Sequence, residues 1–191
     1  MNQKTAMKLF GLLGLLMLLS CGYADRHRNS SSCEQALVDS LEVRVQDSLF
    51  SNVHYSRSQV LDALTQAQDS QVYYRLLALY GKTFFVSSDF DSILYYNRRV
   101  KEFSRNASQS SESLQSPRWN DVLSDVYNIE GNVWMQLNRP DSAIIDYKKA
   151  YGYRLEGKKL HLLPDICINI ADAYLHRSDL AHTASSYRRA L

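Results

Sequence analysis

Hydrophobic positions recur at helical spacing through most of this chain, in runs separated by short polar breaks. The clearest stretch contains small and aromatic residues on both sides of one such break, at Gly131, Trp134, Ala143, Tyr147 and Ala150. The last three follow one another at steps of four and three residues, which places them on one face of an α-helix. The pattern predicts two consecutive helices that pack closely through their small residues.

The same spacing occurs in two further stretches and, in a degraded form, in a third. One stretch consists of Ala171, Tyr174, Thr183, Tyr187 and Ala190, and the other of Gly81, Phe84, Ile93, Asn97 and Val100. The degraded copy consists of Val60, Leu64 and Ala67, preceded by a helical run with Leu37, Leu41, Val45 and Leu49. Copies in phase predict an all-α solenoid of helical hairpins over residues 34–191, with three clear repeats plus one degraded N-terminal repeat. The alternative is a closed helical bundle.

This pattern resembles the tetratricopeptide repeat (TPR) family, whose unit is about 34 residues long. The resemblance covers most of the chain after residue 33. The step from Ala67 to Val100 is 33 residues, but the next two steps, to Ala150 and to Ala190, are 50 and 40 residues. The helices or their links must therefore be longer than in the family. The serine-rich segment 106–116 is predicted to be an exposed loop that accounts for most of the longest step.

The resemblance implies a protein- or peptide-binding groove lined by the first helix of each pair. On this chain it selects Arg75, Lys82, Phe85, Asp125, Asn128, Asn132, Met135, Gln136, Asp165, Ile168, Asp172 and His176. These residues follow one another at steps of three and four within each helix, so they could share one surface. The alternative is that the polar ones only solvate the surface. A carboxylate clamp is not expected, because Asp165 and Asp172 are acidic.

The first residues have the features of a secretory signal. Lys4 and Lys8 precede an apolar run that ends in Leu-Leu-Ser-Cys, and this run is too short to span a bilayer comfortably. The ending resembles a bacterial lipobox, which implies a signal peptide at 1–20, Cys21 as a lipid anchor and a flexible tether at 21–33. The expected location is the bacterial cell envelope, as a membrane-anchored lipoprotein or a periplasmic protein. An ordinary cleaved signal is the alternative.

Composition narrows the remaining function classes. The net charge of +2 is too small for a nucleic-acid-binding domain. The five histidines share no metal-ligand spacing with a cysteine or with one another, and no nucleotide-binding or hydrolase motif occurs. We therefore expect no enzyme activity, cofactor or metal in this segment.

A disulfide between Cys33 and Cys167 has no support in the sequence. Ser116 is predicted to cap a helix that begins at Pro117.

Two functions agree with this architecture. The first is a scaffold of the cell envelope that binds a protein or peptide. The second is the periplasmic sensory input segment of a longer transmembrane histidine kinase or helix-turn-helix regulator, since repeats of this kind resemble the N-terminal regions of some Bacteroidetes signalling proteins. The last predicted helix ends inside the repeat pattern, which favours a truncated chain over a face covered by a partner. An envelope enzyme assembled by the fold alone is the weakest alternative.

Overall fold

The computed structural model describes residues 32–109 and 116–191, and all regular structure in them is helical. The helices are residues 32–48, α2 (Val53–Gln66), α3 (Ser70–Lys82), α4 (Phe90–Gln109), α5 (Pro117–Gln136), α6 (Pro140–Leu155), the short 3-10 helix η1 (Leu160–Leu162), α7 (Leu163–His176) and α8 (Leu180–Ala190). The predicted all-α class is confirmed. None of these described helices is long and apolar enough to cross a membrane. The predicted signal peptide and Cys21 lie outside the described residues.

Local side-chain chemistry explains where several helices begin. The Asn52 carboxamide accepts a hydrogen bond from the amide of the third residue of α2, and Asp69 accepts two from the start of α3. Ser116 caps α5 through its hydroxyl, as predicted, and Pro117 follows in the first turn, where a missing N–H costs nothing. Pro140 has the same place in α6. These residues fix where α2, α3, α5 and α6 begin, and the helices follow one another in the predicted order.

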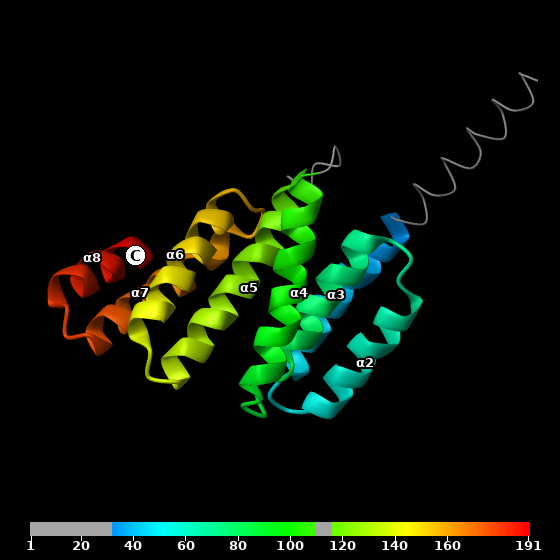
Figure 1. Ribbon diagram of the computed structural model, residues 1–191, viewed down its shortest axis with the longest axis horizontal. Coiled ribbons are helices and arrows are strands. Elements are labelled where there is room, and N and C mark those ends of the chain that lie inside the picture. The colour runs from blue at the N-terminus through cyan, green and yellow to red at the C-terminus, as the bar shows by residue number, and fades with distance from the viewer. Residues whose placement is uncertain (1–31, 110–115) are drawn as a thin grey trace, which may run out of the picture.

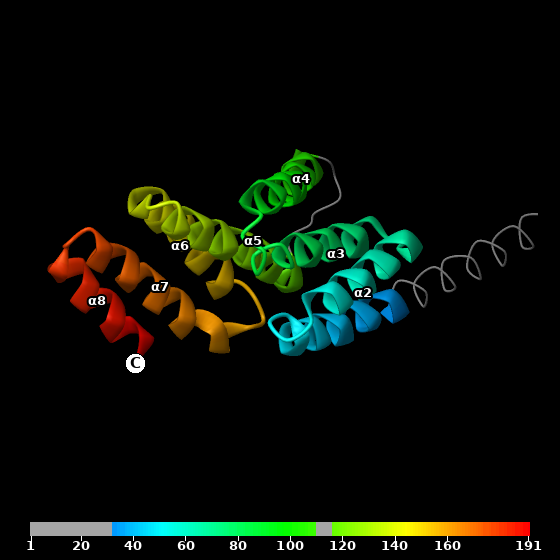
Figure 2. The same ribbon diagram turned by 90° about the horizontal axis from the view of Figure 1, so that it is seen from below.

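Consecutive helices pack as antiparallel neighbours (Figure 1). The pairs α3–α4, α5–α6 and α7–α8 are in contact, and the first helix of one pair also contacts the first helix of the next, α3 with α5 and α5 with α7. Helix 32–48 packs against α2 and α3 through Val38, Leu41 and Val45, and Leu49 in the turn after it joins the same cluster. Figure 2 shows that the row of helices bends, so that helix 32–48 and α7 lie on the same side of α5.

The turns inside the three later pairs have one geometry. Ser88, Asn138 and Ser178 adopt left-handed backbone conformations, with φ of 53°, 56° and 59°. In each turn the amide of the following residue donates to the carbonyl four residues before the left-handed one, at 3.2, 2.8 and 3.0 Å. These carbonyls belong to the aromatic positions of the predicted repeat, Phe84, Trp134 and Tyr174. This is the Schellman arrangement that ends a helix and reverses the chain. The three turns are separated by the same 50 and 40 residues as the predicted repeats.

The small residues of the best repeat copy are buried where predicted. A Cβ added to Gly131 would lie 2.3 Å from Cε1 of Tyr147, so the ring packs directly on the α5 backbone. Ala143, Ala150 and Ala171 are completely buried. In the preceding pair Gly81 lies against Tyr96 and the buried Asn97 in the same way, although less tightly. Close approach of first and second helices through small residues is therefore confirmed in these pairs.

Some predicted packing positions differ. Tyr187 is 37% exposed and Ala190 is only half-buried, because no described element packs on the outer side of α8. Leu37 is exposed, and its neighbour Val38 takes the buried place in helix 32–48. The prediction of a loop over 106–116 was wrong in part, since α4 continues to Gln109. Residues 32 and 33, assigned to the tether, already belong to a helix.

Candidate partner-binding surface

The solvent-accessible stripes of α5 and α7 lie next to each other, and we call them together the inner face. The predicted residues that belong to it are half-buried on α5 and exposed towards its end and on α7: Asp125, Asn128, Asn132, Gln136, Asp165, Ile168, Asp172 and His176. A hydrogen bond of 3.0 Å from Asn169 of α7 to Asn128 of α5 joins the two stripes. Sequence reasoning did not select Asn169. The bond brings the polar stripes of α5 and α7 together at Asn128 and Asn169.

Tyrosines of the second helices orient two side chains of the inner face. The hydroxyl of Tyr147 in α6 donates to Oδ1 of Asn132 at 2.7 Å, and the hydroxyl of Tyr187 in α8 donates to Asp172. The two pairs occupy equivalent positions in successive hairpins. Burial raises the pKa of Tyr147, and the hydrogen bond to Asp172 raises that of Tyr187, so both hydroxyls stay protonated as donors at neutral pH.

Residues predicted on α3 are covered by helix 32–48. Arg75 is only 4% exposed, and its guanidinium donates to Asp39 at 2.7 Å and to Glu42 at 2.9 Å. Lys82 donates to Gln46 of the same helix at 2.6 Å. The groove placement of Arg75 is therefore wrong, and Lys82 makes an internal contact. The reason is tertiary, because the polar stripe of helix 32–48 lies along the stripe of α3.

Phe85 and Met135 belong to the hydrophobic packing more than to the surface. Phe85 packs against Ile93 and Val133, between α4 and α5. Met135 packs against the cluster that joins α6 to α7. Both side chains are half-buried, so their predicted contribution to a groove is small.

Sequence reasoning missed a charged cluster next to the inner face. Glu42 of helix 32–48 accepts from Lys159, which precedes η1, at 2.9 Å, and Asp39 accepts from Arg118 at the start of α5 at 3.1 Å. Burial by itself would lower the pKa of Lys159, but the attraction of the Glu42 carboxylate is stronger in sum, so the pKa of Lys159 is raised. These links hold the acidic edge of helix 32–48 against two elements far along the chain.

A second, more deeply buried pair supports the same region. Arg154 of α6 donates to Asp121 of α5 at 2.7 Å, and both side chains are buried. Asp121 also accepts the backbone amides of residues 158 and 159 at 3.0 and 3.1 Å. Gly157 allows this approach, since a Cβ there would lie 2.2 Å from Oδ1 of Asp121. The loop after α6 is thus held in place by one carboxylate of α5.

The paired residues of these two clusters are 33 to 117 residues apart in the sequence, so no short sequence pattern could predict the pairs. Within the residues that the structure describes, no group of three His, Cys, Asp or Glu side chains could hold a metal ion. Cys33 and Cys167 are both free thiols, the first exposed and the second buried. The inner face thus offers hydrogen-bonding groups, carboxylates and one exposed isoleucine.

No protein-family model, curated protein or solved structure matches this chain.

Proposed function

We propose that this chain is a helical-repeat scaffold of the bacterial cell envelope that binds a protein or peptide across the inner face. The observation that carries the proposal is the direct packing of α5 on α7, the first helices of two successive hairpins, with the Asn169–Asn128 bond across this contact. Such packing joins the accessible stripes of successive hairpins into an extended surface. Extended surfaces of this kind are what stacked helical repeats use to bind partners.

Three features support a tetratricopeptide-like solenoid over a closed bundle. The turns at Ser88, Asn138 and Ser178 repeat one geometry at the predicted steps. Buried apolar side chains form successive clusters between neighbouring elements along the described chain. The small-residue contacts recur at equivalent places, at Gly81 and at Gly131. A chain in which each unit contacts mainly its neighbours has these properties.

The chemistry of the inner face indicates the kind of partner. Asp165 and the exposed carboxylate side of Asp125 favour a segment with positive charge, while Asn128 can pair with backbone amides or carbonyls. Ile168, 41% exposed and one turn after Asp165 on α7, offers an apolar contact. An elongated peptide with basic residues and one apolar anchor fits this arrangement.

Attachment to a membrane through Cys21 is part of the proposal. The chemical support is the Leu-Leu-Ser-Cys ending of the apolar run, and several acyl chains on one residue anchor a protein stably. Metabolic labelling with palmitate tests it. The wild-type chain should take up label and a Cys21→Ala variant should not. Label that persists in the variant would refute the anchor.

Site-specific photo-crosslinking in cells tests the inner face. A photoreactive residue is placed at Ile168 on α7 or, as a matched control, at Ile145, which is 57% exposed on α6. We expect a discrete crosslinked protein from position 168 and none from position 145. The partner identified by mass spectrometry is then purified, and its binding should fall on Ile168→Arg and stay unchanged on Ile145→Arg. Equal crosslinking from both positions, or equal binding by both variants, would reject the inner face as the binding surface.

A further inference from the structure

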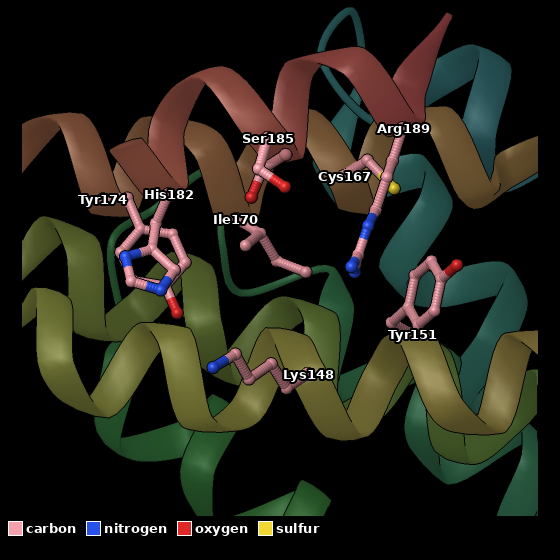
Figure 3. A pocket seen from close by; sticks show the side chains of 9 residues that line it. Lys148, Tyr151, Cys167, Ile170, Tyr174, His182, Ser185 and Arg189 are labelled. Carbon is pink, nitrogen blue, oxygen red and sulfur yellow. The ribbon is translucent and has the colours of Figure 1, made fainter. Parts of the chain in front are cut away.

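A cavity of about 190 Å³ lies between α6 and α8, away from the inner face. Figure 3 shows Lys148 and Tyr151 of α6 on one side of it, and Ser185 and Arg189 of α8 on the other. Ile170 of α7 lies between the two sides. The volume is below the roughly 300–1,000 Å³ of pockets for drug-sized ligands, so an occupant would be small.

α6 and α8 each contribute one cationic side chain to the wall of this cavity. Lys148 and Arg189 both line it. Figure 3 shows the Arg189 side chain extending from α8 towards α6, and the Lys148 ammonium lies 5.5 Å from the centre of the Tyr174 ring at one end of the cavity. The guanidinium of Arg189 is also close enough to the buried Cys167 thiol to oppose the rise that burial causes in the thiol pKa. Among the described residues, none that lines the cavity carries a carboxylate. Both cations border one partly enclosed space, so an anion in the cavity would be attracted to each of them.

The remaining walls combine hydroxyl groups with apolar surface. Ser185 and Ser186 bring two hydroxyls from α8, and Tyr151 lies opposite them on α6. Tyr174 closes one end, with the His182 ring stacked on it at a centroid distance of 4.7 Å. Hydroxyl donors beside cations are suited to the oxygens of carboxylate and phosphate groups, and the rings and Ile170 are suited to a compact apolar group.

We propose that this cavity is a binding site for a small anionic molecule or chain end that carries a carboxylate or phosphate next to a compact apolar group. Lys148 and Arg189 neutralise the anion, and the hydroxyls of Ser185 and Ser186 donate to its oxygens. The site is formed by α6, α7 and α8, and none of its lining residues belongs to the inner face, so it goes beyond the proposed inner-face function and does not depend on it.

Isothermal titration calorimetry on the full chain tests the proposal, with phenyl phosphate and phenylacetate as probes and benzyl alcohol as the neutral comparison. The variants Lys148→Gln and Arg189→Gln each remove one cation from the cavity. Lys149→Gln and Arg188→Gln are matched controls, because they make the same charge change one residue away, at side chains that do not line the cavity. Circular dichroism confirms that each variant is folded.

We expect saturable binding of at least one anion, no binding of benzyl alcohol, and a loss of affinity of about tenfold or more in each cavity variant, as for a lost charge-assisted hydrogen bond. The control variants should bind within about twofold of the wild type, since only screened, long-range charge is removed. Tighter binding of phenyl phosphate would indicate a phosphate ligand, and tighter binding of phenylacetate a carboxylate. Absence of binding by both anions, or an equal loss in cavity and control variants, would overturn the proposal. Either result would leave the crosslinking test at Ile168 unaffected.

Discussion

The contact between Gly131 and Tyr147 gives the sharpest test of how these hairpins are held together. In a Gly131→Ala variant the new methyl group would lie 2.3 Å from Cε1 and 2.4 Å from Cδ1 of Tyr147. The ring has little freedom to move away, because the side chain is buried and its hydroxyl is bonded to Asn132 at 2.7 Å. Either the two helices separate or the ring leaves its place.

The expected magnitude combines three effects. Overpacking a well-packed contact costs about 1–3 kcal/mol. Loss of the Tyr147 hydrogen bond adds roughly 1 kcal/mol. Alanine in place of glycine inside a helix contributes about 1 kcal/mol in the opposite direction. We therefore expect Gly131→Ala to lower the free energy of unfolding by about 1–3 kcal/mol.

Gly152 in α6 is the matched control, because no atom lies within 4 Å of a Cβ added there. Gly152→Ala should stabilise the protein by up to about 1 kcal/mol through helix propensity alone. Urea unfolding followed by far-UV circular dichroism measures both variants. In a Tyr147→Leu background the penalty of Gly131→Ala should shrink or reverse, since the ring that obstructs the methyl group is gone. A Gly131→Ala variant as stable as Gly152→Ala would contradict the close packing of the Tyr147 ring on Gly131.

Three further predictions concern charge and protonation. Asp121→Ala removes the buried partner of the Arg154 guanidinium, which keeps only the half-exposed Asp125, and should cost about 3 kcal/mol in urea unfolding. Asp141→Ala, which breaks a solvent-exposed pair, should leave the midpoint unchanged. Burial raises the pKa of Tyr127 to about 12, so the stability that this side chain contributes is complete below pH 10 and is lost as the pH rises through about 12. In a Tyr127→Phe variant the free energy of unfolding should therefore fall less steeply with pH above pH 10. An unchanged pH dependence would contradict this. Lys159→Gln should speed hydrogen exchange in helix 32–48, because it removes the ion pair with Glu42 of that helix. Lys158→Gln is the control and should leave the exchange rate unchanged, since Lys158 bonds to Asp121 through its backbone amide, which the substitution keeps. Equal exchange rates in both variants would show that the ion pair is unimportant.

Agreement between sequence and structure is closest where a feature depends on neighbours along the chain. The steps of three and four that join Ala143, Tyr147 and Ala150 predicted one buried helix face, because helix geometry alone relates these positions. Ser116 and Pro117 predicted a helix start for the same local reason. Agreement fails at Tyr187, where the spacing is kept but nothing described packs on the outer side of α8.

The sequence by itself determined the all-α class, the order of the later hairpins and the small-residue contacts within them, because these follow from periodicity over one or two helical turns. Only the tertiary structure decided which predicted surface residues are accessible. Arg75 has the spacing of a surface residue but is buried, since helix 32–48 brings Asp39 and Glu42, 36 and 33 residues earlier, onto it. The cavity between α6 and α8 could not be predicted either, because Lys148 and Arg189 line one cavity only after two hairpins have packed. Charges far apart in a chain become neighbours through packing, and no local spacing encodes that approach.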